Sequence, residues 1–222
     1  MNIDPTRKII QQVFEEHIVA APGMEKIRTM VAGKIMPTPG AVMNAALALC
    51  DEIGDLMAVD VGGATTDVHS VTEGSPEIQA MLTGPEPFAK RTVEGDLGIY
   101  VNAPSVVRRI GKDALVRELA FDPIEVLARK EVIPDLPDEI ALVERLALEV
   151  VTQAVRRHAG CVKHLYGPGG RMTVAEGKDL TRVKTIIGTG GPLTRLPGGL
   201  EILGSILNRG KVGSPQSPSA EA

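Results

Sequence analysis

Aromatic residues are scarce in this 222-residue chain. Phe, Trp and Tyr make up 2% of it and Trp is absent, which argues against the stacking platforms that bind single-stranded nucleic acid. The net charge of −4 argues against sequence-independent binding to phosphate backbones, because such binding needs an excess of Lys and Arg. We therefore expect no nucleic-acid partner.

Cysteine and long hydrophobic runs are also sparse. Cys50 and Cys161 belong to no CxxC pair, which is typical of reduced thiols in an intracellular protein. No apolar run approaches the length of a membrane span, and the charged N-terminal segment lacks the core of a signal peptide. The sequence therefore predicts a cytoplasmic protein without a membrane partner.

The periodicity of the apolar residues predicts an α/β fold. Helices are expected at 5–18, 39–53, 137–160 and 198–210, and at 103–130 in two or three pieces broken near Gly111 and Asp122-Pro123. Strands are expected at 56–60, 67–73 with alternating residues, 77–82, 88–93, 161–167 and 183–191. These elements form a lobe with a helical insertion at 56–208. An N-terminal helical segment at 1–55 is expected to pack on this lobe, and a disordered tail is expected at 209–222.

Small, polar and acidic residues interrupt the apolar stretch "LMAVDVGGATTDVHSV" at 56–71. Glycine lets the backbone approach a ligand and expose its N–H groups, which is how an anion is cradled, and threonine hydroxyls add donors. Asp60, at the strand end, is suited to hold a hydrated divalent cation or to orient a water. The alternative is a type I′ hairpin that uses Gly-Gly as its turn. We favour phosphate binding.

A second glycine-rich turn, "IIGTGGPLTR", follows another apolar strand. Gly188, Gly190 and Gly191 would allow the main chain to lie flat against a nucleotide base or ribose. A flexible connection between strand and helix is an equal alternative for this segment alone.

The two turns resemble the second phosphate motif and the adenosine motif of the actin, sugar-kinase and Hsp70-type ATPases. More closely, the chain from Thr38 to Thr194 is similar to the glutamate-mutase MutL family, which is unrelated to the mismatch-repair protein of that name. The segments that carry this resemblance are "PTPGAVMNAA", "DVGGATTDVHSV", "VEGDLG", "RRHAG", "GKDLT" and "IGTGGPLT". Members of the family are ATPase-type accessory proteins of adenosylcobalamin-dependent mutases and aminomutases.

The resemblance implies an actin-like ATPase lobe, ribonuclease H-like, with a mixed sheet flanked by helices. It implies ATP and Mg²⁺ as cofactors, with Asp60 as the catalytic acid that directs Mg²⁺ through water. The phosphates would contact Gly62, Gly63, Ala64, Thr65 and Thr66, and the adenosine would contact Gly188, Thr189, Gly190 and Gly191. "VEGDLG" and "GKDLT" match the family, but we assign no mechanism to Glu94, Asp96, Lys178 or Asp179.

The resemblance also implies a function and a partner protein. ATP binding and hydrolysis would drive a conformational change that reactivates a partner mutase, in the manner of a chaperone. An ATP-dependent enzyme similar to hydantoinases or acetone carboxylases, a kinase, or a scaffold without turnover are the alternatives. The first-lobe motif Asp-x-Gly-Ser/Thr does not precede Asp60, so we expect a fragment that lacks this lobe. A separate chain would supply it, and this chain alone would be inactive.

Other charged residues are expected on the surface. Arg156 and Arg157 should form the solvated face of the long helix at 137–160, and His69 should be packed or exposed rather than catalytic. His158 and His164 have no convincing metal-ligand spacing.

Overall fold

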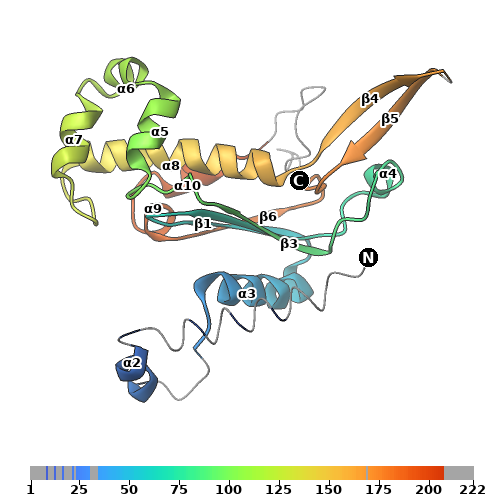
Figure 1. Cartoon of the computed structure of the whole chain (residues 1–222), viewed down its shortest axis with the longest axis horizontal. Helices are drawn as coiled ribbons and strands as arrows, with labels where there is room; N and C mark the ends of the chain where they lie inside the picture. The colour runs from blue at the N-terminus through green and yellow to red at the C-terminus, as the bar shows by residue number, and fades with distance from the viewer. Residues whose placement is uncertain are drawn as a thin grey trace. The chain divides into compact units, whose positions relative to one another are not determined.

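The computed structural model describes residues 9, 13, 17, 22, 24–30, 35–168 and 170–207 (Figure 1). The chain divides into two compact units, Met1–Ala45 and Ala46–Ala222, with the boundary inside helix α3 (Thr38–Ile53). The first unit contains helix α2 (Met24–Met30). Most of the helix predicted at 5–18 and all of the tail predicted at 209–222 lie outside the described residues.

A four-stranded mixed sheet organises the second unit. Its strands are β1 (Leu56–Val61), β2 (Thr66–Val71), β3 (Ala89–Glu94) and β6 (Thr185–Thr189), in the order β3-β2-β1-β6. Strand β1 pairs antiparallel with β2 and parallel with β6, so that a long crossover joins the two parallel strands. The expected α/β class with a mixed sheet flanked by helices is confirmed.

Six helices follow β3 in the described part of the chain. They are α5 (Ala103–Ile110), α6 (Lys112–Leu119), α7 (Pro123–Arg129), α8 (Pro137–His158), α9 (Gly191–Thr194) and α10 (Gly199–Gly204). The predicted interruptions at Gly111 and at Asp122-Pro123 are confirmed. Gly111 has φ +97°, a conformation that favours glycine, and Asp122 caps α7 by accepting a hydrogen bond from the N–H of Ile124.

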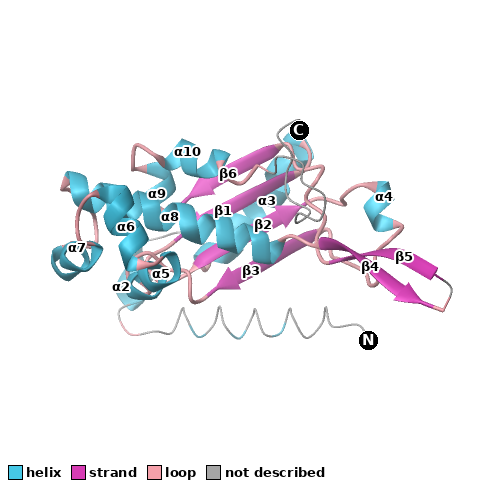
Figure 2. Ribbon diagram, turned by 90° about the horizontal axis from the view of Figure 1, so that it is seen from above, coloured by secondary structure: helices cyan, strands magenta, loops and turns pink. Residues whose placement is uncertain are grey.

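The core forms where α8 crosses one face of the sheet (Figure 2). The apolar stripe of α8 is buried as its helical spacing predicts, and includes Val143, Ala147 and Val151. These residues share one cluster with Met57 and Val59 of β1. Burial of this stripe removes apolar surface from water, which is the main favourable contribution to folding.

Strand β2 is buried more completely than expected. Alternation of apolar and polar residues is typical of a strand with one exposed face, yet all six residues of β2 are buried. On the face away from α8, the thiol sulfur of Cys50 lies 4.0 Å from the carbonyl oxygen of Val71. Both faces of this central strand are therefore covered.

Two predictions outside the sheet need correction. The segment 77–82, expected as a strand, contains the short helix α4 (Pro76–Gln79), because Ser75 caps it and Pro76 suits a first helical turn. A hairpin stands at 161–176, where only its first strand was expected. Its strands are β4 (Cys161–Gly167) and β5 (Gly170–Glu176).

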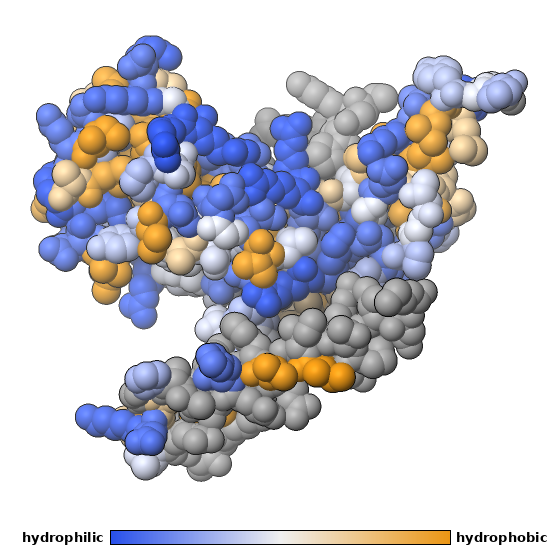
Figure 3. All heavy atoms as spheres, in the orientation of Figure 1, coloured by the Kyte–Doolittle hydropathy of each residue, from blue (hydrophilic) through white to orange (hydrophobic). Residues whose placement is uncertain are grey.

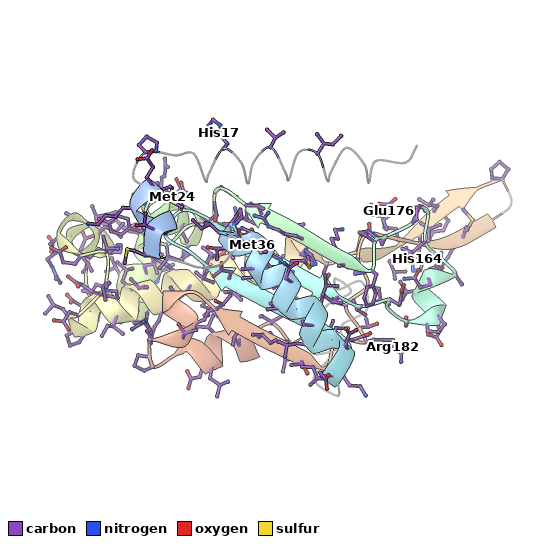
Figure 4. All side chains as sticks on the ribbon, turned by 90° about the horizontal axis from the view of Figure 1, so that it is seen from below. His17, Met24, Met36, His164, Glu176 and Arg182 are labelled. Atoms are coloured by element: carbon purple, nitrogen blue, oxygen red, sulfur yellow. The ribbon has the colours of Figure 1, made fainter. Side chains whose placement is uncertain are left out.

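The β4–β5 hairpin projects from the sheet and carries apolar side chains on its surface (Figure 3). Figure 4 labels His164 and Glu176, which both lie on it. Among the described residues, no helix is both long and apolar enough to cross a membrane.

Candidate functional site

The two glycine-rich turns meet at one edge of the sheet. Because β1 and β6 run parallel, their carboxyl ends lie side by side, with Asp60 opposite Thr189. Gly190 has φ +86°, and a Cβ atom built on it would lie 2.2 Å from the carbonyl oxygen of Val61. The backbone of the second turn is thus in direct contact with the end of β1, where the first turn begins.

The first turn is a four-residue loop, 62–65, between β1 and β2. The Gly62 N–H donates a hydrogen bond to the Thr65 carbonyl oxygen at 2.9 Å. A type I′ turn needs positive φ at both central residues, whereas none of Gly62, Gly63 and Ala64 has positive φ. The type I′ hairpin alternative is therefore wrong.

The carbonyl groups of Gly62, Gly63 and Ala64 face the segment 99–102. Gly62 accepts from the N–H of Ile99 at 3.2 Å, and Gly63 accepts from the N–H groups of Tyr100 and Val101 at 2.8 Å each. Ala64 accepts from the side-chain amide of Asn102 at 2.7 Å. In a trans peptide the C=O and the following N–H point in opposite directions, and the described residues contain no cis peptide bond.

It follows that three successive N–H groups, those of Gly63, Ala64 and Thr65, point away from the segment 99–102. None of the hydrogen bonds formed among the described residues uses these N–H groups. Successive backbone N–H groups without acceptors form a concave donor array that suits an anion. The geometry therefore fits the phosphate site that was predicted here.

Asp60 lies beside this donor array on the face of the sheet away from α8. Its neighbours Val59 and Val61 belong to the core beneath α8, so that Asp60 alternates to the other face, opposite Asp67 of β2. Asp67 forms an ion pair with Arg91 of β3 at 2.7 Å. Burial raises the pKa of the Asp60 carboxyl, the Asp67 carboxylate raises it further, and Arg91 opposes both.

This carboxyl group fits the predicted metal role. Burial and the neighbouring acid disfavour the charged form of Asp60, and a bound cation would compensate for both effects. Oxygen is the ligand that Mg²⁺ prefers, usually with waters completing its coordination. In the part of the chain that the structure describes, no group of three or more His, Cys, Asp or Glu residues is placed to hold a metal ion. A protein cage for the metal is thus absent from these residues.

The hydroxyl groups of Thr65, in the turn, and of Thr66, the first residue of β2, both have hydrogen-bond partners within the protein. Thr66 is fully buried and its hydroxyl donates to the carbonyl oxygen of Leu97 at 2.6 Å. The Thr65 hydroxyl donates to the Asp67 carboxylate at 3.2 Å. An anion in this turn would therefore meet backbone N–H groups first, and contact with the two threonines remains a prediction.

The three glycines of the second turn differ in what surrounds them. A Cβ atom on Gly188 would lie 2.7 Å from a methyl group of Leu203, and one on Gly190 would meet Val61. Gly190 thus requires glycine, because the contact is with backbone and its φ is positive, whereas the contact at Gly188 is with the end of a flexible side chain. Gly191 has no atom within 4 Å of the position of a Cβ atom, and its φ is not positive. Of these three glycines, Gly191 has open space at the position of a Cβ atom, which suits the predicted contact with adenosine.

Arg157 is not simply a solvated residue of the long helix, as was expected. Its guanidinium group forms two hydrogen bonds with the Asp96 carboxylate, at 2.7 and 2.9 Å, and another with Glu94. This ion-pair cluster connects the C-terminal turn of α8 to the segment that follows β3. In that segment, a Cβ atom on Gly98 would lie 2.3 Å from the carbonyl carbon of Ala64. Glu94 and Asp96 therefore hold a segment that packs on the phosphate turn.

Lys178 and Asp179 act at the other end of β2, away from the turn. The buried Lys178 ammonium group donates to the carbonyl oxygens of Thr72, Pro87 and Phe88 at 2.6, 2.5 and 3.1 Å. The Asp179 carboxylate accepts from the N–H and hydroxyl of Ser75 at 2.7 and 3.0 Å. Both residues connect distant loops, which gives "GKDLT" a structural role.

The histidines do not form a shared site. His158 is buried, and its two ring nitrogens lie 2.8 Å from the Ser70 hydroxyl and 2.9 Å from the Thr92 hydroxyl. His164 lies on the exposed β4 strand. His69 is fully buried, and neither ring nitrogen has a hydrogen-bond partner among the described residues. The expectation that His69 is packed rather than catalytic agrees with this position.

Comparison with known proteins agrees with the motifs. The sequence matches the family described as MutL protein over residues 1–222. Protein MutL of Clostridium tetanomorphum is 41% identical over 218 residues, and the alignment covers 91% of this chain and 47% of that protein. The chain thus spans about half the length of this relative. On the match over residues 1–222, the chain belongs to the MutL protein family.

Proposed function

We propose that this chain is an ATP-binding part of an accessory protein that reactivates an adenosylcobalamin-dependent mutase, with an actin-like ATPase lobe as its fold. The observation that carries the proposal is the outward array of the Gly63, Ala64 and Thr65 N–H groups beside Asp60 and Gly191. A phosphate chain, a cation and a nucleoside would each meet a suitable group at this edge of the sheet.

The roles follow from the chemistry of each group. The N–H groups of the turn would donate to phosphate oxygens, and Asp60 would hold Mg²⁺ through water. Gly191 would let the backbone lie against the adenosine. When bound, Mg-ATP supplies the free energy that changes the balance between two conformations. The chain's own residues bind and orient this ligand, and opposing donors from another lobe would complete the site.

The proposed partner rests on family membership. The MutL family, as the motifs above identify it, is associated with glutamate mutase and related adenosylcobalamin-dependent aminomutases. We infer that one conformation of the complete protein opens the mutase so that damaged cofactor leaves. Such coupling requires that the nucleotide bind the two conformations with different affinity.

Asp60→Asn tests the metal role. The substitution keeps the shape of the side chain but removes the charge directed at Mg²⁺. We expect the dissociation constant for Mg-ATP to rise about tenfold or more, equivalent to about 1.4 kcal/mol, with a smaller change for metal-free ATP. Calorimetry with and without Mg²⁺ measures both, and Asp51→Asn on the exposed surface of α3 is the control. Equal losses in the two titrations would show that Asp60 does not act through the cation.

Gly191→Val tests the nucleoside role. Because the position of the new Cβ atom is open, the free energy of unfolding should change by no more than about 0.5 kcal/mol. The branched side chain would fill the space proposed for adenosine, so affinity for both ATP and adenosine should fall at least about tenfold. Gly204→Val, at another open position, is the control. Normal affinity in a folded Gly191→Val protein would show that this turn only connects a strand to a helix and does not contact the nucleoside.

A further inference from the structure

We propose that Asn102 is the positioning residue that holds the phosphate turn in its anion-binding orientation. This inference rests on the proposed function of the turn. Asn102 lies 38 positions after Ala64, at the residue before α5, and no motif marks it in the sequence.

The side-chain amide of Asn102 joins two backbone segments. Its Nδ2 donates to the carbonyl oxygen of Ala64 at 2.7 Å and to that of Gly95 at 2.8 Å. Both partners only accept hydrogen bonds, so the NH₂ end of the amide must face them, and both of its protons are used. The same group therefore fastens the turn 62–65 to the segment that follows β3.

This arrangement replaces the usual task of an asparagine at a helix N-terminus. A side chain in that position commonly accepts a hydrogen bond from an N–H group in the first turn of the helix. Asn102 forms no such cap, and the first helical bonds of Ser105 and Val106 go to its backbone carbonyl instead. The side chain is thus directed at the turn rather than at its own helix.

Among the described residues, Asn102 is also the one whose side chain donates to a carbonyl group of the turn. The bonds from Ile99, Tyr100 and Val101 to the turn carbonyls come from backbone N–H groups, which any residue but proline provides. The bond to Ala64 depends on the amide of Asn102. It fixes the Ala64–Thr65 peptide, and with it the direction of the Thr65 N–H. A substitution of Asn102 therefore changes the orientation of the turn but leaves the residues that carry its outward N–H groups unchanged.

Asn102→Asp in the full chain tests the proposal. A carboxylate cannot donate to the two carbonyl oxygens, and it adds negative charge beside the phosphate site. We expect the dissociation constant for Mg-ATP to rise at least about tenfold, while affinity for adenosine, which has no phosphate, changes less than about twofold. Asn102→Ala, which adds no charge, should show the same selectivity with a smaller loss. Val101→Ala is the matched control, because it keeps the backbone N–H and its side chain is exposed.

Two results would overturn the proposal while the proposed function stands. One is unchanged Mg-ATP affinity in both Asn102 variants, and the other is an equal loss of ATP and adenosine affinity in them. A wild-type chain that binds no ATP would instead contradict the proposed function. In that case NMR without nucleotide tests whether the side chain of Asn102 positions the turn. The amide resonances of Ala64 and Thr65 must shift in Asn102→Ala and must remain in place in Val101→Ala. Unshifted resonances in Asn102→Ala would show that this side chain does not position the turn.

Discussion

Lys178→Met is expected to lower the free energy of unfolding by about 3 kcal/mol. The side chain of Lys178 is 2% exposed, and its ammonium group donates to three carbonyl oxygens from two loops. Methionine has a similar length but no donor, so that these carbonyl groups lose their partner inside the protein. Burial lowers the pKa of Lys178, which shows that holding the charge there is itself costly. The loss of three hydrogen bonds should outweigh the relief of that cost.

Denaturant unfolding at neutral pH measures this effect. Lys184→Met is the control, because Lys184 is exposed and its side chain has no hydrogen bond among the described residues. The control should change the free energy of unfolding by no more than about 0.5 kcal/mol. Similar stability of the two variants would mean that Lys178 does not fasten the loops around β2.

Lowering the pH from 7 to 5 is expected to destabilise the protein by about 4 kcal/mol through two buried histidines. Burial lowers the pKa of His69 to about 4 and that of His158 to about 3. In the unfolded chain both would titrate near the ordinary value of 6.5. Between these values the unfolded state binds more protons than the folded state, so stability falls as the pH falls. Each histidine contributes about 2 kcal/mol over this interval.

His69→Leu should remove about half of this pH dependence. Neither ring nitrogen of His69 has a hydrogen-bond partner among the described residues, so an apolar side chain leaves no described partner unsatisfied. The difference in unfolding free energy between pH 7 and pH 5 should decrease to about 2 kcal/mol. His164→Gln on the exposed β4 strand should leave it unchanged. A wild-type protein with equal stability at both pH values would contradict the neutral state of the two histidines.

Asp60 has the opposite effect on the pH dependence of the free energy of unfolding. Its pKa is raised in the folded state, so the folded protein binds the proton more readily, and this contribution to stability decreases as the pH rises above the ordinary pKa of 3.8. A charged Asp60 is therefore a cost to the fold without a cation, as expected for a group whose partner is a ligand.

The sequence by itself determined the fold class, the long helix α8, the two glycine-rich turns and the family. These features depend on local patterns: a helical stripe over 137–158, and glycines next to polar residues at strand ends. Its account of the glycines was incomplete, however. It assigned Gly188 and Gly190 to a ligand, and it did not show that their Cβ positions lie against Leu203 and Val61.

The tertiary structure alone decided how the turn presents its donors. The direction of the Thr65 N–H depends on Asn102, and the packing of the turn depends on Gly98. Both residues are distant from the turn in the chain. Likewise, Arg157 became an ion-pair residue and Lys178 a buried donor only when the sheet brought separate loops together. Periodicity reports which face of an element is apolar. It does not report which distant carbonyl or carboxylate a side chain will meet, because that follows from the pairing and packing of whole elements.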